Sequence, residues 1–248
     1  ASSAPRLITD NNDSEPCSRL TGSITLVPDA HVADAFIICA NKTNQDNSNS
    51  EAELVWVPRD SQSIEIKHYQ LMDGRFYADI ELNGTKISKT NVLMSGKDAE
   101  AINRKMASAL TILLASEMLG GAQACFDQTI EHLKEREQFG VKIGSFQALQ
   151  HRAAQMYCDL ELCRSVVLDA LEGLDTGASD LALRTSNAKA LANEVYTKIT
   201  SEAVQLHGGM GVTDELDIGL YLKRSRVCNQ LFGDTTTHKK VFAKAMGF

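Results

Sequence analysis

The stretch Ser145–Leu174 reads SFQALQHRAAQMYCDLELCRSVVLDALEGL, and its apolar pattern decides the fold of the C-terminal part of the chain. The apolar positions alternate spacings of four and three, as in the narrow stripe of a helix packed against antiparallel neighbours. These positions are Leu149, Ala153, Met156, Leu160, Cys163, Val167, Ala170 and Leu174. Gly173 and Gly177 lie where such a helix would end. The stretch therefore predicts one member of a helical bundle.

Similar periods occur on both sides of this stretch, where apolar residues again recur every three or four positions. They predict further helices over residues 98–138, 179–206, 214–229 and 235–246. The pair Gly208-Gly209 terminates the Ala-rich member of this set. Residues 97–248 are therefore expected to form an up-and-down bundle of four to five helices.

The first 96 residues have a different pattern, with short β-rich runs separated by Asp, Asn, Gly, Pro and Ser. The runs cover residues 23–27, 35–39, 54–57, 63–66 and 76–80. A polar insert, Asn41–Ser50, predicts a hairpin or loop between two strands. We expect a small antiparallel β domain over residues 1–96, followed by the bundle over 97–248, which makes the fold class α+β.

Composition excludes several classes of protein. With 248 residues and a net charge of −7, the chain has no overall electrostatic reason to bind nucleic acid. Its longest apolar run, Ala109–Ala115, is far shorter than the roughly 20 residues of a membrane span, so none is expected. The six cysteines lack C-x-x-C spacing and the histidines are scattered, so we expect reduced thiols, no metal site and a cytoplasmic location.

Three segments of the bundle carry a resemblance to a known family. They are Arg136-Glu137-Gln138-Phe139-Gly140 with Ile143-Gly144-Ser145-Phe146-Gln147, then Ala203-Val204-Gln205-Leu206-His207-Gly208-Gly209-Met210-Gly211, then Leu222-Lys223-Arg224 leading to Phe232-Gly233-Asp234-Thr235. In this order and spacing they resemble the C-terminal domain of the acyl-CoA dehydrogenase family.

The resemblance implies an N-terminal helical domain, a middle β domain and a C-terminal bundle, and this sequence resembles only the last two. Together with the start at Ala1 rather than Met, this leads us to expect that the N-terminal helical domain is absent. The resemblance further implies an acyl-CoA substrate, an electron-transfer acceptor and an FAD cofactor shared with a neighbouring subunit. It also implies a homo- or hetero-oligomer assembled through the bundle helices as a dimer of dimers.

The chemistry of FAD indicates which residues would hold it. A pyrophosphate calls for a planar cation and for backbone that the ligand can approach closely. Arg136 supplies the cation, and Gly208 and Gly209 supply bare backbone. The resemblance adds further cofactor contacts at Gln138, Phe139, Phe146, Gln147, Gln205, Leu206 and His207.

The resemblance also implies a carboxylate that removes the α-proton of the thioester while the flavin accepts the β-hydride. Many members place this base as a Glu immediately before Gly-Thr. In this chain Phe232 falls on that position and Asp234 on the threonine. Other members place the base early in the first bundle helix, before an Arg, where this chain has Leu110 and Thr111.

Two other carboxylates are therefore candidates for the base. Asp234 lies two residues from the missing Glu. Glu117 lies in an apolar run, where an unpaired carboxylate would be costly without a partner or a function. The alternative for Glu117 is that it points outward or pairs with a helix neighbour such as Arg104 or Lys105.

The β domain also lacks a residue that the resemblance assigns to the flavin site. The strand whose Thr contacts the flavin ring corresponds to Leu26-Val27-Pro28, and Pro28 has neither a hydroxyl nor an N–H to offer. A family loop upstream of this strand has its only trace in Asp13-Ser14-Glu15-Pro16.

Three functions remain open from the sequence. The chain is one subunit of a heteromeric dehydrogenase of the kind that acts on steroid side-chain thioesters, with the base on a second acyl-CoA dehydrogenase subunit. Alternatively, it is a divergent homo-oligomeric dehydrogenase that uses Asp234 or Glu117. The third function is that of an inactive helical scaffold without its own flavin.

Overall fold

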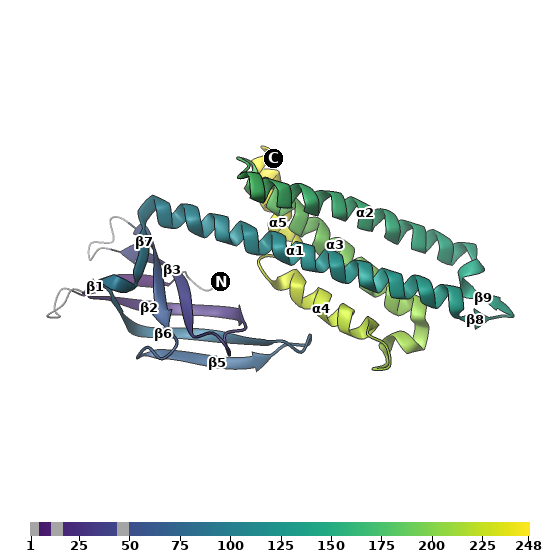
Figure 1. Ribbon diagram of the computed structural model, residues 1–248, viewed down its shortest axis with the longest axis horizontal. Coiled ribbons are helices and arrows are strands. Elements are labelled where there is room, and N and C mark those ends of the chain that lie inside the picture. The colour runs from purple at the N-terminus through teal and green to yellow at the C-terminus, as the bar shows by residue number, and fades with distance from the viewer. Residues whose placement is uncertain (1–4, 11–16, 44–49) are drawn as a thin grey trace. The chain divides into compact units, whose positions relative to one another are not determined.

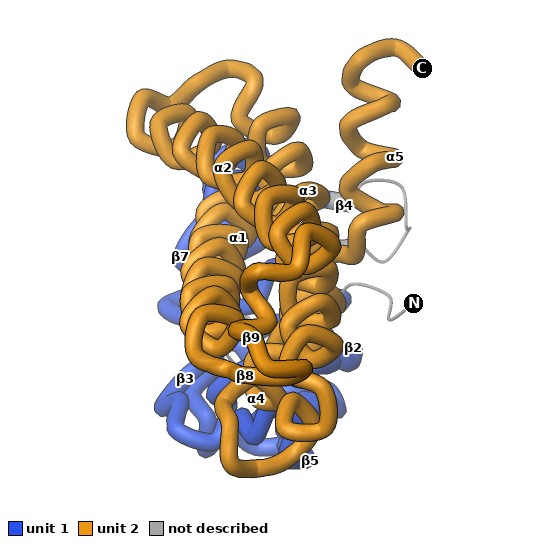
Figure 2. The backbone as a smooth tube through the Cα atoms, turned by 90° about the vertical axis from the view of Figure 1, so that its right-hand side faces the viewer, with its two compact units in different colours: residues 1–106 blue, residues 107–248 orange. Residues whose placement is uncertain are grey.

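The computed structural model describes residues 5–10, 17–43 and 50–248. The chain divides into two compact units, residues 1–106 and residues 107–248 (Figure 2). The division falls within a long helix that begins at Gly96. The domain boundary predicted between residues 96 and 97 therefore stays a prediction.

Unit 1 is a seven-stranded sheet with the order β5-β6-β2-β1-β3-β4-β7 (Figure 1). The strands are β1 Arg6–Asp10, β2 Cys17–Pro28, β3 Ala35–Thr43, β4 Ser50–Pro58, β5 Ile64–Gln70, β6 Phe76–Ser88 and β7 Val92–Ser95. A short 3-10 helix, η1 (Lys89–Asn91), precedes β7. The five β-rich runs of the sequence overlap β2 to β6, with Ser63 just before β5, whereas β1 and β7 were not predicted.

The pairing is antiparallel except between β1 and β3, which run parallel. The sheet is therefore mixed rather than purely antiparallel. The polar insert predicted as a hairpin joins β3 to β4, which pair antiparallel. Its residues 44–49 lie outside the described residues, and so does the segment 13–16.

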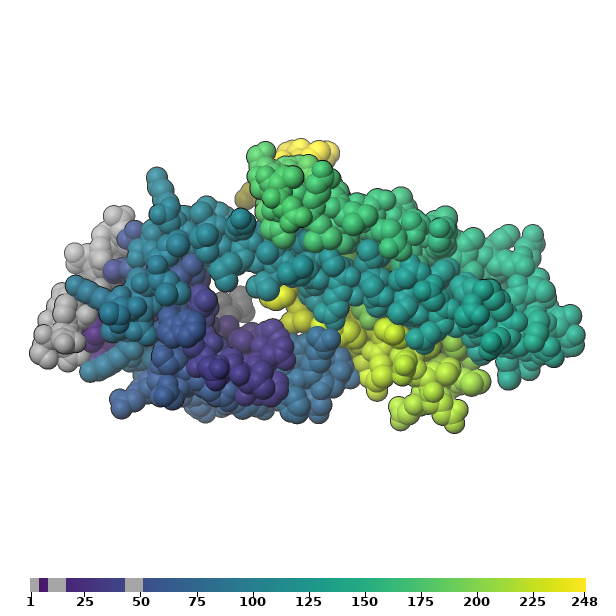
Figure 3. Space-filling view, in the orientation of Figure 1, coloured from purple at the N-terminus to yellow at the C-terminus, as the bar shows by residue number. Residues whose placement is uncertain are grey.

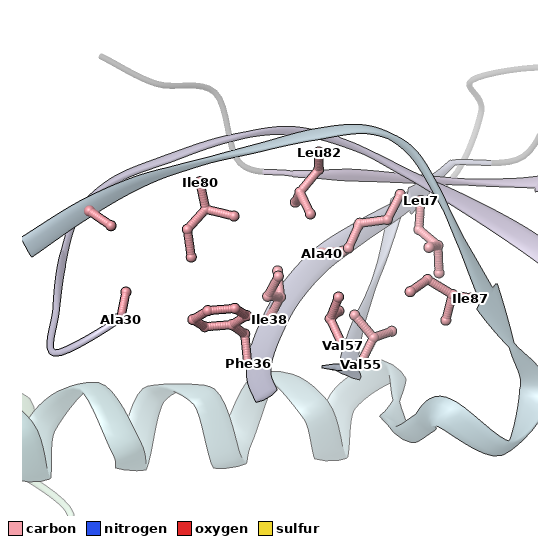
Figure 4. Close-up of a cluster of buried hydrophobic side chains, with 12 residues drawn as sticks. Leu7, Ala30, Phe36, Ile38, Ala40, Val55, Val57, Ile80, Leu82 and Ile87 are labelled. Carbon is pink, nitrogen blue, oxygen red and sulfur yellow. The ribbon is translucent and has the colours of Figure 1, made fainter. Parts of the chain in front are cut away.

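The core of unit 1 follows the period of two that strands impose on side chains. In β3, Phe36 and Ile38 are buried, whereas Ile37 between them is 50% exposed. Figure 4 shows Ile80 and Leu82 of β6 on the opposite side of the cluster from Phe36 and Ile38. Apolar side chains of strands far apart in the sequence thus meet in one cluster.

Unit 2 is the helical bundle. Its helices are α1 Gly96–Glu135, α2 Gln147–Thr176, α3 Leu181–His207, α4 Ile218–Gln230 and α5 Thr235–Ala245. The first residues of α1 belong to unit 1. Successive helices from α1 to α4 run in alternating directions, and α3 contacts α2, α4 and α5 (Figure 1). The predicted up-and-down bundle is confirmed.

The apolar stripe of Ser145–Leu174 becomes the buried face of α2. Its buried members are Met156, Leu160, Cys163, Val167 and Ala170. Gly177 ends the helix with a φ of 66°, a left-handed conformation that glycine adopts without steric cost. The period of the sequence therefore located both the helix and its buried face.

Helix α1 is long and apolar enough, by length and composition alone, to cross a membrane. The core helix of a bundle meets the same criterion, and Ile112, Ala115, Met118 and Ala122 of α1 are buried within the protein. The expectations of no membrane span and of a cytoplasmic location stay predictions.

Candidate functional site

A tight turn connects α1 to α2 and places Arg136 at the end of the bundle. The Arg136 N–H donates to His132 O at 2.9 Å, and the Ile143 N–H donates to Arg136 O at 2.9 Å. Between these two bonds, the short strands β8 (Glu137–Gln138) and β9 (Val141–Lys142) form a hairpin.

The hairpin loop consists of Phe139 and Gly140, with φ values of 55° and 80°. Two positive φ values in a two-residue loop match the type I′ turn, which fits the twist of paired strands. The chain then passes a short 3-10 helix, η2 (Ile143–Ser145). A Cβ on Gly144 would lie 2.8 Å from Leu133 O, so this close approach to α1 requires glycine.

The end of α3 reaches the same end of the bundle. Gly208 is its C-cap, with φ 60° and ψ −138°, and its N–H donates to Gln205 O. The 3-10 helix η3 (Gly208–Val212) follows. A Cβ built on Gly208 or Gly209 would meet no described atom within 4 Å. The backbone here is therefore open to the approach of a ligand.

These segments line one open pocket with a cavity volume of about 510 Å³, within the range typical of small-molecule sites. Its lining residues are His132, Arg136, Gln138, Ile143, Gln205, Leu206, His207, Gly208, Gly209, Met210 and Thr213. The pocket lies at the end of unit 2 that carries the β8–β9 hairpin, the teal tip of the bundle in the space-filling view (Figure 3). Seven of the residues proposed from the resemblance to bind the cofactor lie together there: Arg136, Gln138, Gln205, Leu206, His207, Gly208 and Gly209.

The other three proposed cofactor residues lie outside the lining of this pocket. Phe139 is 92% exposed at the tip of the hairpin, and its ring contacts that of Phe146 edge-on, with 6.2 Å between centroids. Gln147 is the exposed first residue of α2. The two rings and Gln147 form a separate surface beside the turn, and their role in cofactor binding stays a prediction.

The Arg136 guanidinium is available to bind a ligand. Its side chain is exposed, and among the described residues its guanidinium has no ion-pair or hydrogen-bond partner. A planar guanidinium that lines a pocket and lacks an internal carboxylate is suited to bidentate binding of a phosphate. The geometry therefore fits the role proposed for Arg136.

Sequence reasoning missed His132 as a site residue. Its ring stacks on that of His207, with 4.2 Å between centroids and 25° between planes. Burial, together with the nearby His207 and Arg136, lowers the pKa of His132, while Glu135 opposes this shift. His132 lies one helical turn before Arg136, so the four-residue spacing could have placed both side chains on one face of α1.

The candidate base Asp234 has a structural role in this fold. It is the N-cap of α5, and its Oδ1 accepts a hydrogen bond from the Thr237 N–H at 2.7 Å. Hydrogen bonds from Thr237 lower the pKa of the Asp234 carboxyl. An N-cap carboxylate with a lowered pKa is a weak proton acceptor.

The segment between α4 and α5 is held from two sides. Phe232, at the base position of the family motif, has a φ of 55°, and its carbonyl accepts from His238 Nε2 at 2.9 Å. The fully buried Lys189 donates from Nζ to Gly233 O at 3.1 Å and to Cys228 O at 2.9 Å. These bonds fix the backbone of the segment.

The candidate base Glu117 forms an ion pair with Arg224. Its two carboxylate oxygens accept from Nε and Nη2 of Arg224 at 2.8 and 3.0 Å. The Arg224 side chain is only 13% exposed. The partner is therefore a residue of α4, and not Arg104 or Lys105; Arg104 instead pairs with Glu100.

The β2 segment of unit 1 uses its Leu26 N–H in a hydrogen bond within the unit. A bulge interrupts the pairing of β2 with β6 between Ile24 and Val27, and Leu26 there has a φ of 60°. The Leu26 N–H donates to Asp79 Oδ1 at 3.1 Å, and the same oxygen accepts from the Tyr69 hydroxyl at 2.8 Å. The Leu26 N–H is thus used within the protein, and Pro28 has none.

Comparison with known proteins identifies the family of the chain. A family model described as acyl-CoA dehydrogenase, C-terminal domain, matches residues 106–247. The acyl-CoA dehydrogenase IpdE2 of Mycolicibacterium smegmatis is 41% identical over 128 residues, which cover 52% of this chain and 39% of that protein. The short/branched chain specific acyl-CoA dehydrogenase of Rattus norvegicus is 29% identical over 230 residues, 91% of this chain and 52% of that protein.

Solved structures show the same fold. The ChsE4-ChsE5 complex from Mycobacterium tuberculosis matches with a TM-score of 0.86 at 22% identity, over 98% of this chain and 63% of that chain. The matched region is therefore only part of each relative's length. Because the family model matches more than half of this chain, the chain belongs to the acyl-CoA dehydrogenase family.

Proposed function

We propose that this chain is a subunit of an FAD-dependent acyl-CoA dehydrogenase and that it completes an FAD site at a subunit interface. The observation that carries the proposal is the pocket at the end of unit 2, which brings Arg136 together with Gly208 and Gly209. The pocket would hold the adenosine diphosphate half of FAD, while the flavin ring would lie in a neighbouring subunit.

Each part of the pocket has a task that its chemistry fits. Arg136 would bind the diphosphate through its planar guanidinium. Gly208 and Gly209, which have no Cβ, would let the ligand approach the backbone closely. When bound, FAD supplies the hydride acceptor for dehydrogenation of the acyl group. The contribution of this chain is to hold and orient the cofactor.

The state of the two candidate bases supports a base on another subunit. Asp234 caps α5, Glu117 is paired with Arg224, and Phe232 occupies the family position of the base. The similar Mycobacterium tuberculosis structure is a complex of ChsE4 with ChsE5, which favours a heteromer over a homo-oligomer. The partners would be a second acyl-CoA dehydrogenase subunit, the acyl-CoA substrate and an electron-transfer acceptor.

The first experiment is to produce the chain alone and together with a candidate partner dehydrogenase and to measure bound FAD by its visible absorbance. The proposal expects stoichiometric FAD and acyl-CoA dehydrogenase activity only in the mixed assembly. Stoichiometric FAD and full activity in the chain alone would contradict the heteromer. No flavin in either preparation would favour the alternative of a scaffold without its own flavin.

The second experiment tests the two carboxylates in the mixed assembly. Asp234→Asn retains a residue that caps helices well, and Glu117→Gln retains the shape of the side chain. If the base lies on the partner, both variants keep turnover close to that of the parent protein. A loss of turnover of about a thousandfold in either variant, with normal FAD content, would assign the base to that residue instead.

A further inference from the structure

The pocket at the end of unit 2 contains two imidazoles, His132 and His207, to which the proposed function gives no chemical task, although the resemblance implies that His207 contacts the cofactor. His132 comes from the last turn of α1 and His207 from the last turn of α3, and both line the pocket beside Arg136. Their rings stack with 4.2 Å between centroids. His207 is 7% exposed, whereas His132 is half-buried.

The hydrogen bond of His207 determines where this ring can gain a proton. Nδ1 lies 2.8 Å from Ala203 O, and because a carbonyl only accepts, Nδ1 carries a hydrogen. A second proton would therefore enter at Nε2.

The charges around the two rings disfavour protonation of His132 and His207 at the same time. His132 faces His207 and Arg136, both of which disfavour its protonation, and Glu135 of α1 favours it. On the hairpin, Glu137 is paired with Lys142 at 2.9 Å. The remaining residues that line the pocket are uncharged: Gln138, Ile143, Gln205, Leu206, Gly208, Gly209, Met210 and Thr213.

A bound diphosphate would instead favour protonation of an imidazole. Its negative charge would offset the repulsion between Arg136 and a protonated imidazole. We propose that His132 and His207 bind the diphosphate of the dinucleotide together with Arg136, and that the pair takes up one proton from solvent when the ligand binds. The proton enters an imidazole nitrogen on binding and returns to solvent on release. This inference rests on the proposed function of the same pocket.

The test measures FAD affinity of the mixed assembly between about pH 6 and about pH 8, where histidine titrates and the diphosphate diester of FAD does not. We expect the affinity to be up to about a hundredfold higher at the lower pH, because uptake of one proton changes the affinity about tenfold per pH unit. Calorimetry in two buffers of different ionisation enthalpy should show uptake of about one proton per FAD.

His132→Gln is the test variant, because His132 is the less buried member of the pair. It should bind FAD with an affinity that no longer depends on pH in this range. His151→Gln, an exposed histidine on α2 outside the pocket, is the matched control and should keep the parent dependence. Unfolding temperatures of all three proteins show whether the variants fold normally.

The outcomes separate this inference from the proposed function. FAD binding that does not change with pH in the parent protein, or that keeps its dependence in His132→Gln, contradicts the role of the histidine pair and leaves the FAD site intact. Absence of FAD binding at every pH in the parent assembly contradicts both proposals.

Discussion

The end of unit 2 and the β2 segment of unit 1 both contain residues that the family resemblance assigns to FAD, but their polar groups are in opposite states. At the end of unit 2, the Arg136 guanidinium has no partner among the described residues, and the glycine backbone is open. In β2, the Leu26 N–H is bound to Asp79, and Pro28 lacks an N–H.

Under the proposed function, this difference would mean that the chain keeps the half of a shared FAD site that lies in unit 2 and lacks the half in β2. A ligand binds at a lower free-energy cost where polar groups are already exposed and oriented than where internal hydrogen bonds must first break. The bundle end is therefore suited to a dinucleotide, and the β2 segment is suited to holding unit 1 together.

The largest effect is expected for Arg136→Ala. Loss of a charge-assisted contact to phosphate should weaken FAD binding by the mixed assembly about 10- to 100-fold, with little change in stability because the side chain has no internal partner among the described residues. Titration of the apo assembly with FAD measures this. Lys134→Ala, in the same helical turn but bonded to Glu131, is the control and should bind FAD normally. Equal FAD affinity in both variants would mean that Arg136 does not bind the cofactor and that the end of unit 2 is no better suited to FAD than β2.

A smaller effect is expected for Gly209→Ala. The added methyl meets no described atom within 4 Å and Gly209 has no positive φ, so the unfolding temperature should not change. FAD affinity should fall about five- to tenfold because the methyl occupies the path of approach to the backbone.

Gly208→Ala is the matched comparison for this variant. Its φ of 60° with ψ of −138° is a conformation nearly restricted to glycine. This variant should therefore lower both the unfolding temperature and the FAD affinity. If Gly209→Ala binds FAD as tightly as the parent, the ligand does not approach the backbone there.

A still smaller effect is expected in β2. Pro28→Thr restores the hydroxyl residue of the family, yet FAD affinity should change by less than about twofold, because the Leu26 N–H, two residues earlier, remains bound to Asp79. The same FAD titration measures this. A marked gain in affinity would mean that unit 1 still contributes to the flavin site and that the two regions differ less than their hydrogen bonds indicate.

The smallest effect is expected at Asp234 and concerns acid stability. Its folded-state pKa is lowered from 3.8, so it contributes stability above that value, and this contribution is lost as the pH falls through the folded-state pKa. Asp234→Asn should therefore lose less stability than the parent protein on acidification below about pH 4.

Asp234→Ala removes the cap as well as the charge. At neutral pH it should lower the unfolding temperature by about 2–4 °C, whereas Asp234→Asn should not. Thermal unfolding followed by circular dichroism measures both variants. Equal unfolding temperatures for the Ala and Asn variants would contradict the capping role.

Local patterns predicted much of the fold. The period of α2 located the helix and its buried face, and the glycines at its end and at Gly208 marked helix termini. The parallel pairing of β1 with β3 was not predictable in this way. A strand carries the same period of two whichever way its neighbour runs.

The candidate site was less predictable. The partner of Glu117 is Arg224, 107 residues away in the sequence, and no periodicity connects α1 with α4 over that separation. Likewise, the stack of His132 on His207 joins the ends of α1 and α3. The resemblance implied ten cofactor residues, but it did not indicate that Phe139, Phe146 and Gln147 lie outside the lining of the pocket.

The sequence by itself determined the two kinds of secondary structure and the absence of a carboxylate at the family position of the base, because these depend on residues near one another in the chain. It placed the helices only approximately: the helix predicted over residues 98–138 ends at Glu135, before the hairpin of β8 and β9, and the helix predicted from residue 214 begins at Ile218. The tertiary structure decided which polar groups are free to bind a ligand. That property depends on partners such as Asp79 for Leu26 and Arg224 for Glu117, which only packing brings within hydrogen-bonding distance. Among the described residues, Arg136 has no ion-pair partner, because the packing of the bundle places no carboxylate against its guanidinium.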